Sequence, residues 1–163
     1  MGYQTSYLGR LDIEPPLNDA EVEWLTAFHH TSRDLHPHDP YEVPMHPRAE
    51  RSEVDGIGPS PDLHAAALRF CDWGPTPNGM CLRWHEADKS NGALRELSYL
   101  IEHFLRPGAR ASTDGRADFE EFTFDHVVSG VIAAERSDGR LTLLVAEDNE
   151  LREMVLVPGA DPW

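Results

Sequence analysis

The sequence is short of basic residues. It has 14 Lys and Arg residues, with Lys89 as the single lysine, against 29 Asp and Glu residues, so the formal net charge is −15. Binding to phosphate backbones or anionic lipids normally depends on clustered Lys and Arg, so we expect no direct nucleic-acid or membrane binding. The same charge either attracts a protein partner that has a basic surface or only keeps the chain dissolved.

Cysteines and long apolar runs are also scarce. The two cysteines, Cys71 and Cys81, do not form the Cys-x-x-Cys pattern of zinc sites. We expect both thiols to be reduced, because nothing else indicates secretion. No apolar run approaches the roughly 18–20 residues that cross a bilayer, and the first residues lack the basic and apolar regions of a signal peptide. A cytoplasmic protein is expected.

The length and the apolar content suit one folded domain. The chain has 163 residues, of which 40% are hydrophobic, and we expect a single domain over 1–157 with a flexible tail at 158–163. An irregular loop is expected at 31–60, since a loop this long and rich in proline and histidine cannot hold regular structure. Five prolines interrupt it: Pro37, Pro40, Pro44, Pro47 and Pro59.

Two segments near the start show clear periodicity. Alternating apolar and polar residues over 7–14 predict a half-buried strand. Asn18 and Glu21 have the spacing of a capping box and predict a helix over about 19–30. A weaker signal, proline at a first helical position, favours a short helix over 60–70.

The middle of the chain contains the strongest helical pattern. Gly and Pro over 73–79 predict turn or coil, and the following residues 80–86 alternate as a strand. Asn91 is placed to cap a helix that ends before Pro107. Its apolar stripe consists of Leu94, Leu97, Leu100, Ile101, Phe104 and Leu105.

The last third reads as a series of strands. A short strand is expected around Phe119, Phe122 and Phe124. Three more are predicted at 127–134, 141–146 and 151–157, with turns at Asp138-Gly139 and Asp148-Asn149. We therefore predict an α+β fold, in which an antiparallel sheet with a C-terminal β-meander has one face covered by two amphipathic helices.

Five segments have a pattern that is found elsewhere: Gly2-Tyr3-Gln4-Thr5, Gly9 to Asn18, Gly79 to Trp84, Leu97 to Gly108 and the closing hairpin from Leu141 to Asn149. In these segments the chain resembles a family of small acidic proteins from actinobacteria and bacteriophages that has no assigned activity. The loop departs from the family, whose members are richer there in Gly and Arg than in His and Pro. The resemblance implies a phage or prophage context, and no reaction.

Histidine is concentrated at the end of the first predicted helix and in the loop that follows it. Five of the nine histidines lie between His29 and His46. Imidazoles and carboxylates are ligands for zinc or iron, which makes a metal-dependent enzyme one hypothesis. Its candidate ligands are His36, His38, Asp39 and His46. A solvated loop that is merely rich in histidine explains the same residues, so we expect no cofactor.

Other catalytic patterns are weak. Cys81 and His85 share a strand face, but neither a nucleophile elbow nor a Ser-x-x-Lys motif is present. Adjacent carboxylates such as Glu120 and Glu121 point to opposite sides of a strand, so a solvated edge explains them better than acid–base catalysis. We expect no catalytic residues. His103 is expected at the boundary of its helix, with a hydrogen bond near the C-terminus.

The leading hypothesis is a non-enzymatic acidic accessory protein that binds a macromolecular partner with a basic surface. A DNA-mimic inhibitor of a host DNA-binding or defence protein is an alternative, and a homodimer formed through an edge strand is another. Trp73, flanked by Gly and Pro, is the tryptophan expected at an interface. The acidic candidates for partner binding are Glu120, Glu121, Asp125, Glu147, Asp148, Glu150 and Glu153.

Overall fold

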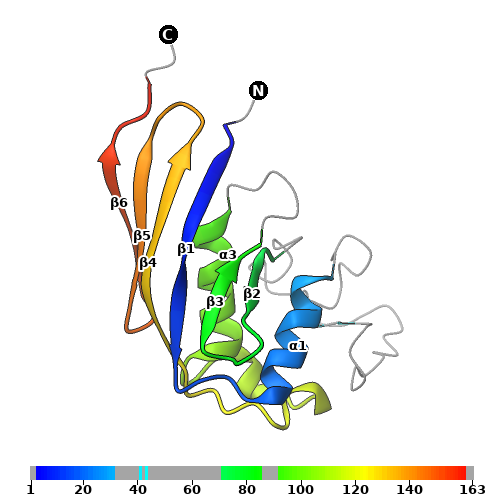
Figure 1. Ribbon diagram of the computed structural model, residues 1–163. Helices are drawn as coiled ribbons and strands as arrows, with labels where there is room; N and C mark the ends of the chain where they lie inside the picture. The colour runs from blue at the N-terminus through cyan, green and yellow to red at the C-terminus, as the bar shows by residue number, and fades with distance from the viewer. Residues whose placement is uncertain (1–2, 32–40, 42, 44–70, 86–91, 161–163) are drawn as a thin grey trace, which may run out of the picture.

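The protein is an α+β fold built on a six-stranded antiparallel sheet (Figure 1). The computed structural model describes residues 3–31, 41, 43, 71–85 and 92–160. The strands are Thr5–Glu14 (β1), Trp73–Pro75 (β2), Cys81–Trp84 (β3), Val127–Arg136 (β4), Leu141–Glu147 (β5) and Glu150–Val157 (β6). Their order in the sheet is β2-β3-β1-β4-β5-β6. The predicted fold class and C-terminal meander are confirmed.

Two helices lie on one side of this sheet (Figure 1). Helix α1 spans Asp19–His29, and helix α3 spans Ala93–Leu100 and continues into a π-helical turn, Ile101–Leu105. The apolar stripes of both helices are buried against the sheet. No helix in the described residues is long and apolar enough to cross a membrane.

Helix α1 begins where the capping box predicts. The Asn18 side chain accepts from the Glu21 backbone N–H at 2.9 Å, and Glu21 Oε1 accepts from the Asn18 N–H at 2.9 Å. Two backbone donors that have no partner in the helix are satisfied in this way, which typically contributes about 1 kcal/mol. The local sequence is therefore sufficient to place this end of the helix.

An aromatic cluster forms the centre of the core. Trp24 is fully buried, and its ring centre lies 5.1 Å from Phe28, 4.8 Å from Phe104, 5.1 Å from Phe119 and 5.7 Å from Phe122. The strand expected around Phe119, Phe122 and Phe124 is wrong. A 3-10 turn, Ala117–Phe119, and irregular chain take its place, because Phe119 and Phe122 both pack against Trp24, and Phe124 packs against Phe122.

Trp73 is a second correction. The predicted turn at 73–79 begins instead with strand β2, which pairs with β3 and places Trp73 opposite Trp84. The Trp73 side chain is 1% exposed, and its Nε1–H donates to the Ala93 carbonyl at 2.8 Å. The expectation that Trp73 lies exposed at an interface is therefore wrong, since the ring fills the space between β3 and the start of α3.

The second helix differs from its prediction at its first residues. The N-cap is Gly92, without a capping side chain, and Asn91 lies outside the described residues. The helix ends before Pro107 as expected. His103, expected at the boundary, is 3% exposed; its Nδ1 lies 2.5 Å from the Tyr41 hydroxyl, and its ring stacks on Tyr99.

The hairpin between β5 and β6 turns at the predicted pair. Asp148 and Asn149 have φ values of 51° and 68°, as a type I′ turn requires. The Asn149 side chain accepts from the Val128 N–H at 2.7 Å and donates to the His126 carbonyl at 2.9 Å. The tip of this hairpin is thus bound to the start of β4.

The opposite face of the sheet has no helix over it in the described chain. Its side chains alternate with the buried ones, so that Leu8 is 72% exposed while Leu11 is 1% exposed. One row of paired residues on this outer face is entirely apolar: Leu8, Ala133, Leu143 and Met154. We call this set the apolar row.

Candidate functional site

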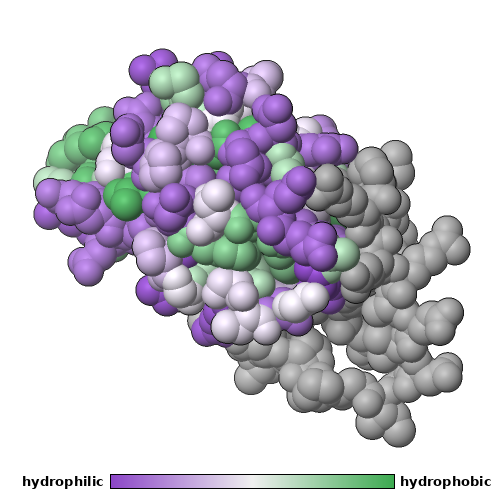
Figure 2. All heavy atoms as spheres, turned by 90° about the horizontal axis from the view of Figure 1, so that it is seen from below, coloured by the Kyte–Doolittle hydropathy of each residue, from purple (hydrophilic) through white to green (hydrophobic). Residues whose placement is uncertain are grey.

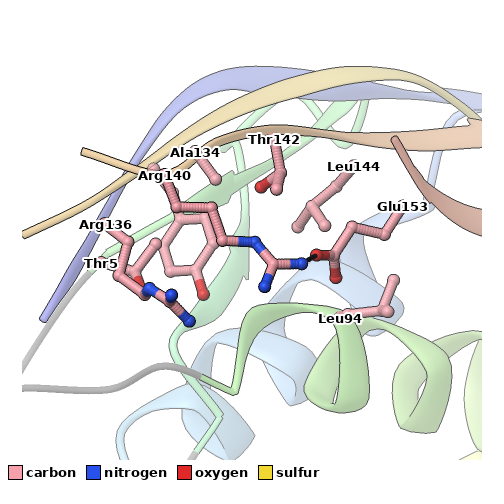
Figure 3. Close-up of a pocket in the computed structure, with 9 residues that line it drawn as sticks. Thr5, Leu94, Ala134, Arg136, Arg140, Thr142, Leu144 and Glu153 are labelled. Carbon is pink, nitrogen blue, oxygen red and sulfur yellow. Dashed lines mark hydrogen bonds and ion pairs between the residues drawn. The ribbon is translucent and has the colours of Figure 1, made fainter. Parts of the chain in front are cut away.

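A pocket lies on the helix side of the sheet, beyond the first turn of α3 (Figure 3). Figure 1 shows the ends of β1, β4, β5 and β6 that reach past this helix. The cavity has a volume of about 210 Å³, smaller than the roughly 300–1,000 Å³ typical of sites for drug-sized ligands. Its lining residues are Thr5, Tyr7, Leu94, Ala134, Arg136, Arg140, Thr142, Leu144 and Glu153.

Strand register brings these residues together. Tyr7 pairs with Ala134, and Ala134 pairs with Thr142, so these three positions form one row across β1, β4 and β5. Leu144 pairs with Glu153 in the next inward row. Paired residues of neighbouring strands point to the same face of the sheet. Residues that are far apart in the sequence therefore line the same pocket.

One guanidinium at the pocket is firmly held. Arg136 donates through Nε and Nη2 to the two carboxylate oxygens of Asp138, at 2.8 and 2.6 Å, and lies 4.4 Å from the ring centre of Tyr3. The hydrogen bonds from Arg136 lower the pKa of Asp138 to about 2. Asp138 therefore holds Arg136 in a fixed position at the pocket and balances its charge.

The second guanidinium reaches across the pocket. Arg140 Nη2 donates to Glu153 Oε1 at 3.1 Å, and Figure 3 shows the two side chains meeting between the strands and α3. Both are partly exposed, at 33% and 37%, and such ion pairs contribute little because water screens them. Glu153, a predicted partner-binding residue, thus faces Arg140.

Hydroxyl groups complete the polar wall. Thr142 is 8% exposed, and its hydroxyl makes no hydrogen bond to any residue that the structure describes. Burial raises the pKa of Tyr7, although hydrogen bonds with the Ala93 backbone and the Thr5 side chain oppose the shift. Thr142 therefore presents an unused hydroxyl donor to this pocket.

Glu21 and His126 form a second group of polar side chains, which is buried and separate from the pocket. Glu21 and His126 are each 1% exposed, and His126 Nε2 lies 2.7 Å from Glu21 Oε2. The other ring nitrogen, Nδ1, lies 2.7 Å from the Pro15 carbonyl. Both nitrogens face acceptors, and both can donate only in the protonated ring. The pair joins the start of α1 to the start of β4. Because both side chains are buried, a substrate has no access to them.

The pKa of His126 reflects this geometry. Burial by itself lowers the pKa, but the hydrogen bonds to Glu21 and Pro15 and the negative charge of Glu21 outweigh it, so the pKa is raised. The imidazolium is thus stabilised inside the fold. We interpret this pair as a structural contact that sequence reasoning missed, since no local motif joins residues so far apart in the chain.

Three imidazoles gather at the end of α1. The ring centre of His29 lies 4.7 Å from that of His30 and 5.5 Å from that of His85. His29 Nδ1 donates to the Cys71 carbonyl at 2.6 Å. Burial, then the charge of His29, lowers the pKa of His85. Within the described ranges, no three His, Cys, Asp or Glu side chains are arranged to hold a metal ion.

The predicted metal ligands lie elsewhere in the chain. His36, His38, Asp39 and His46 fall outside the described residues, as does the helix expected over 60–70. Of the two thiols, Cys71 is buried and Cys81 is partly exposed, and neither is in a disulfide. Burial and the neighbouring Asp12 carboxylate raise the pKa of Cys81, which disfavours the reactive thiolate.

The predicted acidic residues occupy three places. Glu147, Asp148 and Glu150 surround the β5–β6 turn and are exposed. Asp125 is also exposed and precedes His126, whose carbonyl is bound to that turn. Glu120 and Glu121 are exposed on the segment beside Asn18, whose side chain donates to the Glu121 carbonyl at 2.8 Å.

Figure 2 shows the molecule from below, the end at which Figure 1 places the β5–β6 turn. Hydrophilic side chains predominate, with smaller hydrophobic areas between them.

Next to the apolar row, a row on the outer face begins and ends with arginine: Arg10, Val131, Val145 and Arg152. These two rows of the outer face therefore present apolar and basic side chains.

The free edge of the sheet is apolar over half of its length. Seven of the eight residues of β6 are exposed. The last four are Met154, Val155, Leu156 and Val157, exposed by 43%, 51%, 55% and 44%. The other edge, β2, has three residues that are buried or partly buried and includes Pro75. Only the β6 edge is therefore open to another strand in the described part of the protein.

No family model, curated protein or solved structure matches this chain.

Proposed function

We propose that this protein is a non-enzymatic acidic binding protein that accepts an extended segment of a protein partner along the free edge of β6. The observation that carries the proposal is this edge, with four consecutive exposed apolar residues, Met154–Val157. An edge strand presents unpaired backbone donors and acceptors, and soluble proteins usually protect such edges with charge, proline or a short length. The β2 edge has such protection.

The charges around β6 indicate which kind of partner segment fits this edge. Carboxylates at Glu147, Asp148 and Glu150 lie at the start of the strand, and apolar side chains follow toward its end. A segment with Lys or Arg at one end and alternating apolar residues along the rest complements this arrangement. Backbone hydrogen bonds provide affinity in strand addition, while charge acts mainly on encounter rate and specificity.

The experiment is capture of the partner by cross-linking in the source cells, with two variants of matched exposure. Leu156→Lys places a charge on the β6 edge, where Leu156 is 55% exposed and has no paired residue in β5. Val131→Lys places the same charge in the middle of the sheet, where Val131 is 50% exposed. We expect Leu156→Lys to lose the partner and Val131→Lys to keep it.

Two further measurements sharpen the result. Hydrogen exchange should show protection of β6 amides in the complex, and capture should weaken at high salt, because the acidic turn is exposed. Equal capture by both variants contradicts the proposal. Sedimentation of the purified chain over a range of concentrations tests the homodimer, and self-association that Leu156→Lys abolishes would make a second copy the occupant.

A further inference from the structure

We propose that the pocket beside α3 is a binding site for a small organic carboxylate, with Arg140 and Thr142 as its recognition residues. This site lies on the helix side of the sheet and is independent of strand addition at β6. The cavity of about 210 Å³ limits the ligand to a few carbon atoms around its acid group.

Glu153 already occupies the position of the ligand's head group. Its carboxylate accepts from Arg140 Nη2 at 3.1 Å, which shows that the guanidinium is oriented to hold a carboxylate at this place (Figure 3). Because Glu153 is 37% exposed, it can turn to solvent, and the exposed pair that is lost contributes little. A free carboxylate can then take both donors of one guanidinium edge, which is the stronger arrangement.

Thr142 is the second observation. The residue is 8% exposed and lines the pocket, and its hydroxyl makes no hydrogen bond within the described chain. Figure 3 shows this hydroxyl directed toward the same space as the Arg140 guanidinium. Its O–H is therefore available to donate to a ligand oxygen in the pocket.

The remaining wall explains why the ligand is an organic acid. Leu94, Ala134 and Leu144 contribute apolar side chains to the pocket lining. Inorganic phosphate would leave these side chains in contact with water, whereas a short alkyl stem covers them. Asp138 balances the charge of Arg136, so Arg140 is the guanidinium that attracts the ligand, and the N-terminal end of α3 adds a smaller positive potential. The net charge of −15 acts weakly here because salt screens distant charges.

The test is a titration of the isotopically labelled protein with sodium butyrate, acetate and phosphate, followed by two-dimensional NMR at 0.15 M salt and constant pH. We expect saturable shifts of resonances around the pocket with butyrate. Burial of each additional methylene strengthens binding by up to about fourfold, so butyrate should bind more tightly than acetate. Phosphate that binds as tightly as butyrate overturns the assignment to organic carboxylates.

Matched variants separate the site from the overall charge. Arg140→Gln should weaken butyrate binding at least tenfold, whereas Arg152→Gln, which makes the same charge change on the outer face, should leave it within twofold. Thr142→Val should weaken binding severalfold. Glu153→Gln removes the internal competitor and should tighten binding severalfold, whereas Glu150→Gln should have no effect.

Each result decides the proposal. No saturation at 100 mM butyrate overturns it, as does equal weakening by Arg140→Gln and Arg152→Gln. If Arg140→Gln does not fold, the opposite responses of Glu153→Gln and Glu150→Gln still test the same contact, since equal affinities of these two variants contradict a competing role for Glu153.

Discussion

The buried pair of Glu21 and His126 should make stability fall as the pH rises. The pKa of His126 is raised in the folded protein, whereas the unfolded chain has the ordinary value of about 6.5. Between these two values the folded state binds more protons than the unfolded state, so the free energy of unfolding decreases with pH. The contribution is fully present below about pH 6.5 and is lost as the pH passes the folded-state value.

Glu21→Gln tests this charge with little change of shape. The amide oxygen still accepts from the Asn18 N–H, and the amide nitrogen donates to a neutral His126. The substitution therefore removes the charged hydrogen bond to His126 and the longer one, at 3.3 Å, that Glu21 Oε2 accepts from the Thr123 N–H. Such a bond typically contributes about 1.5–3 kcal/mol, and we expect a loss of about 2 kcal/mol near pH 6. Glu21→Ala also removes the hydrogen bond to the Asn18 N–H and leaves His126 Nε2 without its carboxylate, for which about 3–5 kcal/mol is expected.

The assay is urea unfolding between pH 6 and pH 9, followed by fluorescence, since Trp24 is buried in the folded state. The difference between the wild type and Glu21→Gln should shrink as the pH rises. His30→Asn, which removes an exposed imidazole, is the control and should leave this pH dependence unchanged. If Glu21→Gln matches the wild type at every pH, or if the difference grows with pH, the pair is not a protonated contact.

Two further predictions concern tight turns. Asn149→Gly should cost about 1–3 kcal/mol of unfolding free energy, because it removes two side-chain hydrogen bonds, whereas Asp148→Gly should cost little, since Asp148 also has a positive φ and glycine adopts it freely. Equal losses in thermal or urea unfolding would contradict this. Gly79→Ala should destabilise the protein more than Gly139→Ala: a Cβ at Gly79 overlaps the Leu17 carbonyl oxygen, and one at Gly139 meets nothing within 4 Å. Equal unfolding midpoints for Gly79→Ala and Gly139→Ala would show that residue 79 does not lie close to the Leu17 carbonyl.

Some predictions from the sequence hold because their signals are local. The capping box at Asn18 and Glu21 and the turn at Asp148 and Asn149 act within a few residues, so each shapes the chain wherever it occurs. Alternation over 7–14 likewise predicts β1, since a strand in a sheet with one buried face must alternate. The family resemblance and the phage context stay predictions.

Other properties depended on contacts between distant parts of the chain. Phe119 and Phe122 carry apolar side chains that suit a strand or a turn, and only the position of Trp24 decides between them. Trp73 reads as exposed because Gly and Pro flank it, yet the start of α3 covers it. In both cases the local sequence shows that the side chain is apolar, but it does not show which element of the fold buries that side chain.

The candidate sites show the same division. Charge, composition and strand periodicity are properties of neighbouring residues, so the acidic character and the α+β class were accessible from the sequence by itself. The pocket depends on the register that places Thr142 beside Ala134 and Glu153 beside Leu144. A shift of one residue in either pairing would turn these side chains to the other face, so only the tertiary structure decides that Arg140 meets a carboxylate there.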